Sequence, residues 1–204
     1  MIEKEAMYAL TYGLFVLTTK AEEKQNGCIV NTVAMLTDNP KRITVFVNKA
    51  NYTEELIRQT GVFNVSVLTE SAPFALFKQF GFSSGRDTDK FEGKVYPKTE
   101  NGLYYIPDHT NAVISAKVVG AHDYGTHTLF VAEVTEAKTL SSEQSVTYAY
   151  YQSHIKPKPE TAKVGGVEKW VCKICGYVHE GEELPADFVC PWCKHPAEDF
   201  EQIS

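Results

Sequence analysis

Short apolar stretches separated by glycine, asparagine and proline run through residues 11–137. Their valine, isoleucine, threonine and phenylalanine residues favour strands. Asn26-Gly27 is a dipeptide typical of a hairpin turn. We therefore expect a mainly β domain, an antiparallel barrel. Its candidate strands are Gly13–Thr19, Cys28–Leu36, Arg42–Val47, Phe63–Leu68, Ala112–Gly120 and Thr128–Val134.

Two short helices are expected to interrupt these strands. Asn51, followed three residues later by Glu54, resembles a capping box, and the helix that begins there is expected to end at Gly61. The second helix spans roughly residues 72–80.

The composition changes after Tyr151. Residues 156–166 are rich in proline, glycine and lysine, which is typical of an extended linker. The pattern predicts a barrel over residues 1–155, a linker over 156–167 and a small domain over 168–204.

Charge and hydropathy limit the partners of the chain. The net charge is -6, and residues 168–204 carry eight acidic residues against three lysines, so -5 of it lies there. This balance argues against nucleic acid as a partner. The start of the chain lacks the features of a signal peptide, and no apolar run approaches the ~20 residues needed to cross a bilayer. We expect a cytoplasmic protein that has no membrane partner.

Four of the five cysteines form two C-x2-C pairs at the end of the chain. The pairs are 14 residues apart, so they can fold back until four sulfurs face one ion. Tetrahedral thiolate coordination suits iron and zinc, so spacing alone leaves a redox iron and a structural zinc open. Gly176 is expected to relieve crowding where the first knuckle curls away. The remaining cysteine, Cys28, is interpreted as a small buried side chain.

Five aromatic residues surround these cysteines in a module of fewer than 40 residues, which needs large side chains to form a core. The runs 170–181 and 190–200 resemble rubredoxins, particularly the shortened modules at the end of rubrerythrins. The resemblance implies one iron held by Cys172, Cys175, Cys190 and Cys193. Lys194 departs from the pattern, which has glycine after the last cysteine.

A candidate anion site lies where the strand Arg42–Val47 leads into the first helix. Free backbone N–H groups at the helix start, the Lys49 ammonium and the Thr53 hydroxyl can converge there on a phosphate. Taken alone this is a common arrangement, so the residues leave ligand binding open.

Three further segments are similar, in order, to the flavin-reductase-like FMN-binding split-barrel family. Residues 26–33 resemble its N-G-x-T-A-N-S segment, residues 80–91 its S-G-x-x-x-x-K-F loop, and residues 125–134 its G-D-H-x-x-x-x-G-x-V strand. Ile29 stands where the family has threonine, and Thr126 where it has aspartate.

This second resemblance implies an FMN site and a role for each matching residue. Asn31 and Thr32 would meet the flavin ring and ribityl chain. His127 would be the catalytic residue, beside the ring where nicotinamide docks. The phosphate would be held by Lys49, Asn51 and Thr53, and phosphate or ribityl contacts would come from Ser84 and Lys90.

The order of the two parts resembles the high-molecular-weight rubredoxins of anaerobic bacteria. That resemblance implies that electrons pass from NADH or NADPH, directly or through a partner, to FMN, then to iron and then to an acceptor such as a diiron flavoprotein that reduces oxygen or nitric oxide. The resemblance to the split-barrel family implies a homodimer. Two alternatives stay open. One is a zinc-stabilised FMN-binding or redox-sensing module, and the other is a flavin reductase that releases reduced FMN.

Overall fold

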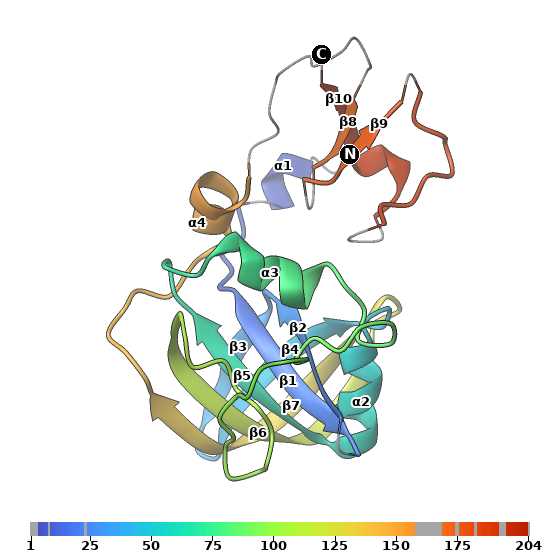
Figure 1. Ribbon diagram of the computed structural model, residues 1–204. Helices are drawn as coiled ribbons and strands as arrows, with labels where there is room; N and C mark the ends of the chain where they lie inside the picture. Colours follow the sequence, from blue (N-terminus) through green and yellow to red (C-terminus); the bar gives the residue numbers. More distant parts are fainter. Residues whose placement is uncertain are drawn as a thin grey trace.

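The computed structural model describes residues 4–7, 9–22, 24–157, 169–173, 176–181, 183–191 and 195–203. Within these ranges it shows a seven-stranded antiparallel sheet and a three-stranded one (Figure 1). Both are antiparallel, so the expected mainly β fold is confirmed. None of the helices in these ranges is long and apolar enough to cross a membrane.

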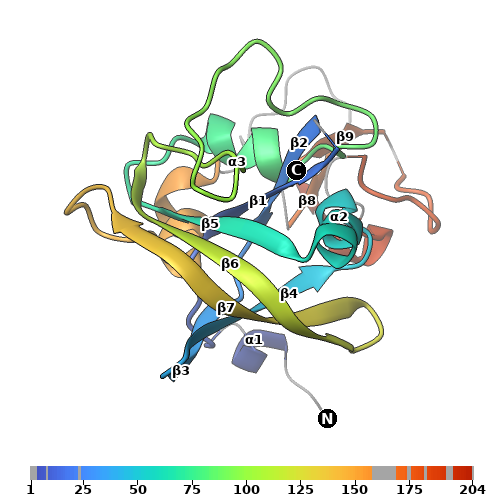
Figure 2. The same cartoon turned by 90° about the horizontal axis from the view of Figure 1, so that it is seen from below.

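The large sheet has the strand order β2-β1-β5-β6-β7-β4-β3. Its strands are β1 (Phe15–Ala21), β2 (Lys24–Val30), β3 (Val33–Asp38), β4 (Lys41–Asn48), β5 (Val62–Leu68), β6 (Thr110–Asp123) and β7 (His127–Thr139). The two edge strands, β2 and β3, follow each other in the chain with only Asn31 and Thr32 between them. Because two residues span only a few ångströms, the sheet must curl until its edges approach. Figure 2 shows the strands curving around a common interior.

Short helices accompany the barrel: α1 (Lys4–Met7), α2 (Tyr52–Thr60), α3 (Phe74–Gly81), α4 (Tyr148–Tyr150) and a π-helical turn, η1 (Tyr151–Ile155). The helix α2 ends at Gly61 as expected, with φ of 69° and an N–H donated to the Ile57 carbonyl. The expected capping box is absent, because the Asn51 side chain makes no cap hydrogen bond. The Glu54 carboxylate instead pairs with Arg58 at 2.7 Å and accepts a hydrogen bond from Thr128 at 2.5 Å.

Two other expectations about strands are wrong. Asn26 and Gly27 lie inside β2, paired with β1, and the chain turns near Glu22, whose φ is 52°. A Cβ at Gly27 would lie 2.7 Å from the Leu17 carbonyl oxygen, so glycine permits close strand packing there. The expected strand Cys28–Leu36 is in fact β2 and β3, broken where the chain crosses from one sheet edge to the other.

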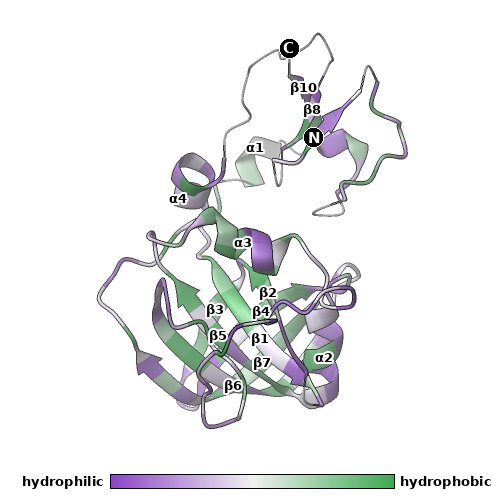
Figure 3. Ribbon diagram, viewed as in Figure 1, coloured by the Kyte–Doolittle hydropathy of each residue, from purple (hydrophilic) through white to green (hydrophobic). Residues whose placement is uncertain are grey.

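Two apolar clusters fill the barrel. The first lies between the strands and includes Leu17, Val45, Phe63 and Phe130, each with no exposed surface. The second joins α3 to the segment after β7, where the ring of Phe77 lies 4.6 Å from that of Tyr151. In Figure 3 the central strands are largely apolar, whereas the far end of β7 is polar.

The C-terminal module contains β8 (Lys169–Cys172), β9 (Val178–Glu180), a 3-10 turn η2 (Ala197–Asp199) and β10 (Phe200–Ile203). The strand β8 lies between the other two. A third cluster forms the core of this module around Cys172, Cys190 and Phe200. Most of the predicted linker, residues 158–167, lies outside the described residues.

Candidate flavin and metal sites

The start of α2 is built as an anion site. The Asn48 side chain accepts a hydrogen bond from the Ala50 N–H at 2.8 Å, and the Asn48 carbonyl accepts one from the Asn51 N–H at 2.9 Å. This turn directs the chain from β4 into the helix. The Glu54 N–H donates to the Asn51 carbonyl at 3.0 Å, and the Asn51 side chain makes no cap hydrogen bond. The N–H groups of Tyr52 and Thr53 therefore stay open at the positive end of α2.

A cavity of about 480 Å³ lies at this helix end. Its walls come from β2, from the start of α2, from the loop after α3 and from the C-terminal module. Four of the predicted FMN residues line it: Asn51, Thr53, Ser84 and Lys90.

Asn26 connects two of these walls. It is buried, and its side-chain amide donates to the Thr53 hydroxyl at 2.9 Å. A Cβ at Gly85 would lie 2.0 Å from the Asn26 side-chain oxygen, so only glycine permits this close approach. Sequence reasoning missed Asn26 as a site residue, because the Asn-Gly dipeptide was interpreted as a turn.

Lys90 is 7% exposed and lines the cavity. Its ammonium donates to the Gly27 carbonyl at 2.8 Å and to the Phe80 carbonyl at 3.0 Å, which joins β2 to α3. Burial lowers the pKa of Lys90, and the neighbouring Cys28 opposes that shift. Burial raises the pKa of the Cys28 thiol, because it too disfavours the charged form. A hydrogen bond with Thr53 and the Lys90 charge oppose this rise.

Arg86 brings a second cation to the wall of the cavity. Its guanidinium pairs with Glu55 at 2.7 Å and lies 4.6 Å above the centre of the Tyr52 ring. Arg86 and Tyr52 both line the cavity, and the Ser84 hydroxyl accepts a hydrogen bond from the Arg86 N–H at 3.2 Å. Sequence reasoning did not select Arg86, although it lies inside the segment that resembles the family's S-G-x-x-x-x-K-F loop.

The other four predicted residues do not line this cavity. Asn31 and Thr32 lie between the sheet edges, where the Thr32 hydroxyl donates to the Phe46 carbonyl at 2.9 Å. The Lys49 ammonium pairs with Asp123, a contact that lowers the pKa of that carboxyl group. His127 begins β7 opposite Asn48 of β4. The predicted flavin contacts thus form two groups. One group lines the cavity, and the other lies outside the cavity, along β4 and at its end.

The four-cysteine site is described in part. Cys172 and Cys190 have no exposed surface, whereas Cys175 and Cys193 lie outside the described residues. In the described ranges no three potential metal ligands gather. The Gly176 N–H donates to the Cys172 carbonyl at 2.8 Å, and Gly176 has φ of 79°, as expected of the residue that ends the first knuckle.

The residues present suit both groups that the sequence implies. For a flavin phosphate the cavity offers an uncapped helix N-terminus, hydroxyl groups and a glycine, Gly85, that lets the loop approach the Asn26 side chain closely. For a thiophilic ion the module offers two fully buried thiols with aromatic side chains around them.

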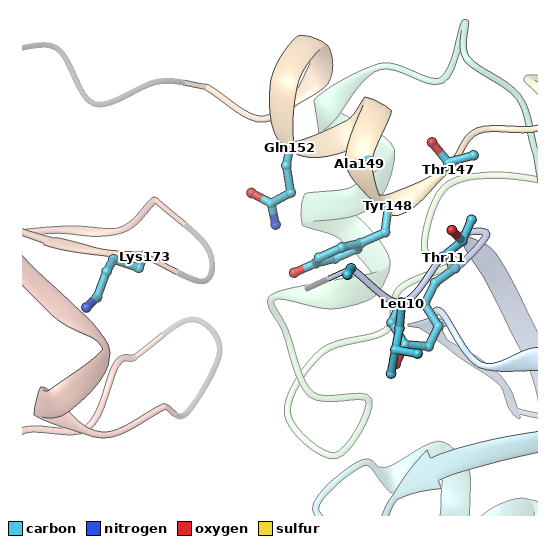
Figure 4. Close-up of a pocket in the computed structure, with 9 residues that line it drawn as sticks. Leu10, Thr11, Thr147, Tyr148, Ala149, Gln152 and Lys173 are labelled. Atoms are coloured by element: carbon cyan, nitrogen blue, oxygen red, sulfur yellow. The ribbon is translucent and has the colours of Figure 1, made fainter. Parts of the chain in front are cut away.

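A second cavity of about 510 Å³ lies between the barrel and the C-terminal module. It is lined by residues 9–12, by the α4 segment and by Lys173. In Figure 4 the Tyr148 and Gln152 side chains extend from the α4 segment toward the module that carries Lys173. None of the predicted site residues lines this second cavity.

Two family models match the chain. Residues 7–159 match the flavin reductase like domain, and residues 170–201 match the rubrerythrin, rubredoxin-like domain.

Similar proteins match either nearly the whole chain or most of it. The chain is 38% identical to the high molecular weight rubredoxin of Moorella thermoacetica, over 99% of this chain and 100% of that protein. It is 40% identical to the ferric-chelate reductase (NAD(P)H) of Archaeoglobus fulgidus, over 80% of this chain and 97% of that protein. Among solved structures, the flavin reductase of styrene monooxygenase from Pseudomonas putida S12 superposes with a TM-score of 0.58 and 26% identity, covering 71% of this chain and 90% of that one.

Proposed function

Because the chain belongs to the flavin reductase-like family and carries a rubredoxin-like module, we propose that it takes electrons from a reduced nicotinamide, directly or through a partner, and passes them through FMN to a four-cysteine iron centre and on to an acceptor protein. The observation that carries the proposal is the open N-terminus of α2, in a cavity whose wall includes residues of the metal module.

The residues of the cavity have complementary parts in holding FMN. The helix N–H groups, the Thr53 hydroxyl and the Ser84 hydroxyl suit a phosphate dianion. Asn31 and Thr32, which lie between the sheet edges outside this cavity, are the proposed contacts of the ring and the ribityl chain. His127, at the start of β7, is the proposed nicotinamide-side residue. Bound flavin supplies the ability to accept a hydride and to release its electrons singly.

The metal module is the proposed site from which electrons leave the chain. Two buried thiols in an apolar, aromatic environment suit an iron whose charge changes by one. The acidic surface of this part of the chain favours an acceptor with a basic patch, and a diiron flavoprotein is the proposed acceptor. Cytoplasmic location is part of the same proposal.

We also propose a homodimer. The edge strand β3 exposes the side chains of Met35 and Leu36 by 76% and 49%, and the neighbouring β4 exposes Phe46 by 38%. An edge strand that carries exposed apolar side chains is a surface that a second copy of the chain can cover. Analytical ultracentrifugation would test this, and a monomer at micromolar concentration would refute it.

An anaerobic titration tests the main proposal. Purified protein reconstituted with FMN and ferric iron is mixed with NADH or NADPH while the flavin and iron-thiolate absorbance bands are followed. We expect both bands to bleach, the iron band with one electron per site. Metal analysis of protein expressed with iron supplied would accompany the titration, and a zinc-filled, colourless tail would refute the iron assignment.

A second candidate function is favoured by the similarity to the ferric-chelate reductase, which has little length beyond the matched segment. In this reading the barrel reduces an external acceptor and the tail is not needed. Replacing Cys172 and Cys190 by serine distinguishes the two functions. In this variant, unchanged turnover with ferric chelate or free FMN would assign that activity to the barrel. Loss of electron delivery to a protein acceptor would assign delivery to the metal module.

A further inference from the structure

Phe82 directly follows α3 and lies between the two predicted cofactor sites. The residues on either side of it, Gly81 and Ser83, both line the cavity at the start of α2 that is proposed to hold FMN, hereafter the flavin cavity. The Phe82 ring packs against the buried cluster of the metal module, which contains Cys172 and Cys190. Among the residues that the structure describes, it is the one barrel side chain in that cluster. One residue therefore connects the cavity wall with the metal-binding core.

The module also contributes to the cavity. His195 and Pro196, which follow the second cysteine knuckle, lie in the cavity wall. The His195 carbonyl accepts a hydrogen bond from the Cys190 N–H at 2.8 Å, so this wall segment is tied to a predicted metal ligand. A third contact comes from Lys156, whose ammonium donates to the Lys173 carbonyl.

Phe82 is held in position from the barrel side. Its N–H donates to the Lys78 carbonyl at 3.2 Å, and its ring centre lies 5.8 Å from that of Phe74, at the start of α3. Figure 1 shows α3 on the side of the barrel that faces the C-terminal module. An aromatic side chain fixed on a rigid element and inserted into a partner's apolar cluster is the usual anchor of a protein interface.

We propose that the metal module docks over the flavin cavity with Phe82 as its anchor, and that electrons pass to the metal in this docked arrangement. The second half of this proposal rests on the proposed function. In the transfer step one electron would pass from the reduced flavin to one ferric ion, which would become ferrous, and the proton that the flavin loses with that electron would go to the bulk solvent outside the docked interface. Docking shortens the distance between flavin and metal and excludes water from the space between them. Because both parts belong to one chain, the rate of transfer is independent of protein concentration.

The first experiment measures docking without electron transfer. In zinc-substituted, FMN-loaded protein, 15N relaxation of backbone amides reports how fast the module tumbles. We expect the wild-type module to tumble with the barrel and the module of Phe82→Ala to tumble several times faster. Phe82→Leu keeps an apolar side chain and should retain docking. Leu140→Ala, an apolar truncation after the end of β7, is the matched control and should leave tumbling unchanged.

The second experiment measures transfer. In iron-loaded protein the flavin is reduced by a light flash, and the first-order bleaching of the iron band is followed at several protein concentrations. We expect a concentration-independent rate that falls about tenfold or more in Phe82→Ala, as expected when a buried aromatic anchor is removed, and stays near the wild-type rate in Phe82→Leu.

These results separate docking from function. Equal tumbling of the wild-type and Phe82→Ala modules would overturn the docking proposal, as would a transfer rate proportional to protein concentration. If the wild-type module tumbles with the barrel, Phe82→Ala releases it and neither protein transfers electrons, docking stands and the proposed electron path fails.

Discussion

Replacing Lys90 by methionine removes the charged group that joins β2 to α3 in the wall of the cavity that is proposed to hold FMN. Two carbonyl groups, of Gly27 and Phe80, lose a donor at 2.8 and 3.0 Å. Hydrogen bonds from a charged donor contribute about 1.5–3 kcal/mol each, so two contribute about 3–6 kcal/mol. Burying the apolar end of methionine offsets about 1 kcal/mol. We expect Lys90→Met to lower the unfolding free energy of the flavin-free protein by about 2–5 kcal/mol.

Urea unfolding followed by circular dichroism measures this loss, with Lys94→Met as the control. Lys94 is exposed, so the same chemical change there should alter the unfolding free energy by less than about 0.5 kcal/mol. If Lys90→Met leaves the flavin-free protein unchanged but destabilises the FMN-saturated protein, the ammonium acts on the phosphate and the reasoning from its carbonyl partners is refuted.

The pH dependence of stability gives an independent check on Lys90. Burial lowers the pKa of Lys90 in the folded protein, so between that lowered pKa and the unfolded value near 10.5 the unfolded chain binds more protons. The contribution of Lys90 to stability therefore rises with pH in this range. The raised pKa of Cys28 acts in the opposite direction above pH 9.0, so the comparison is made in a Cys28→Ala background. The rise should vanish in Lys90→Met.

Three further predictions concern other parts of the molecule. Gly85→Ala places a Cβ 2.0 Å from the Asn26 side chain and should weaken FMN binding about tenfold or more in a fluorescence titration, whereas Gly81→Ala, with its nearest contact at 3.5 Å, should change it far less. Glu54→Gln weakens the contacts of a buried carboxylate with Arg58 and β7, and should lower the unfolding free energy by about 1–3 kcal/mol in urea. Removing the metal with a chelator should abolish the thermal transition of residues 169–203 in calorimetry and leave the transition of the barrel in place, because a small metal module depends on its ion to fold. A single transition that the chelator leaves unchanged would refute the separate folding of the two parts.

The sequence predicted features that depend on local patterns. Five of the six expected strands, the end of α2 at Gly61 and the turn at Gly176 follow from neighbouring residues, and the structure confirms them. The roles predicted for the flavin and metal residues stay predictions, although the structure brings Thr53 and Ser84 to one cavity.

Features that depend on tertiary contacts were not predictable. Lys49 pairs with Asp123, 74 residues away, and no local pattern signals that contact. Asn26-Gly27 has the composition of a turn, but the close approach of Leu17 requires glycine within a strand. Phe82 resembles an ordinary core residue until the metal module is seen packed against it.

The crossing of Asn31 and Thr32 between the two edges of the large sheet is where the barrel closes without a pair of neighbouring strands. In the described sheet β2 and β3 stand at opposite ends of the strand order, so no ladder of hydrogen bonds joins them there. The contacts at this closure are local: the covalent crossing itself and the Thr32 hydroxyl, which donates to the Phe46 carbonyl at 2.9 Å. We therefore expect this seam to be less protected in amide hydrogen exchange than the central strands.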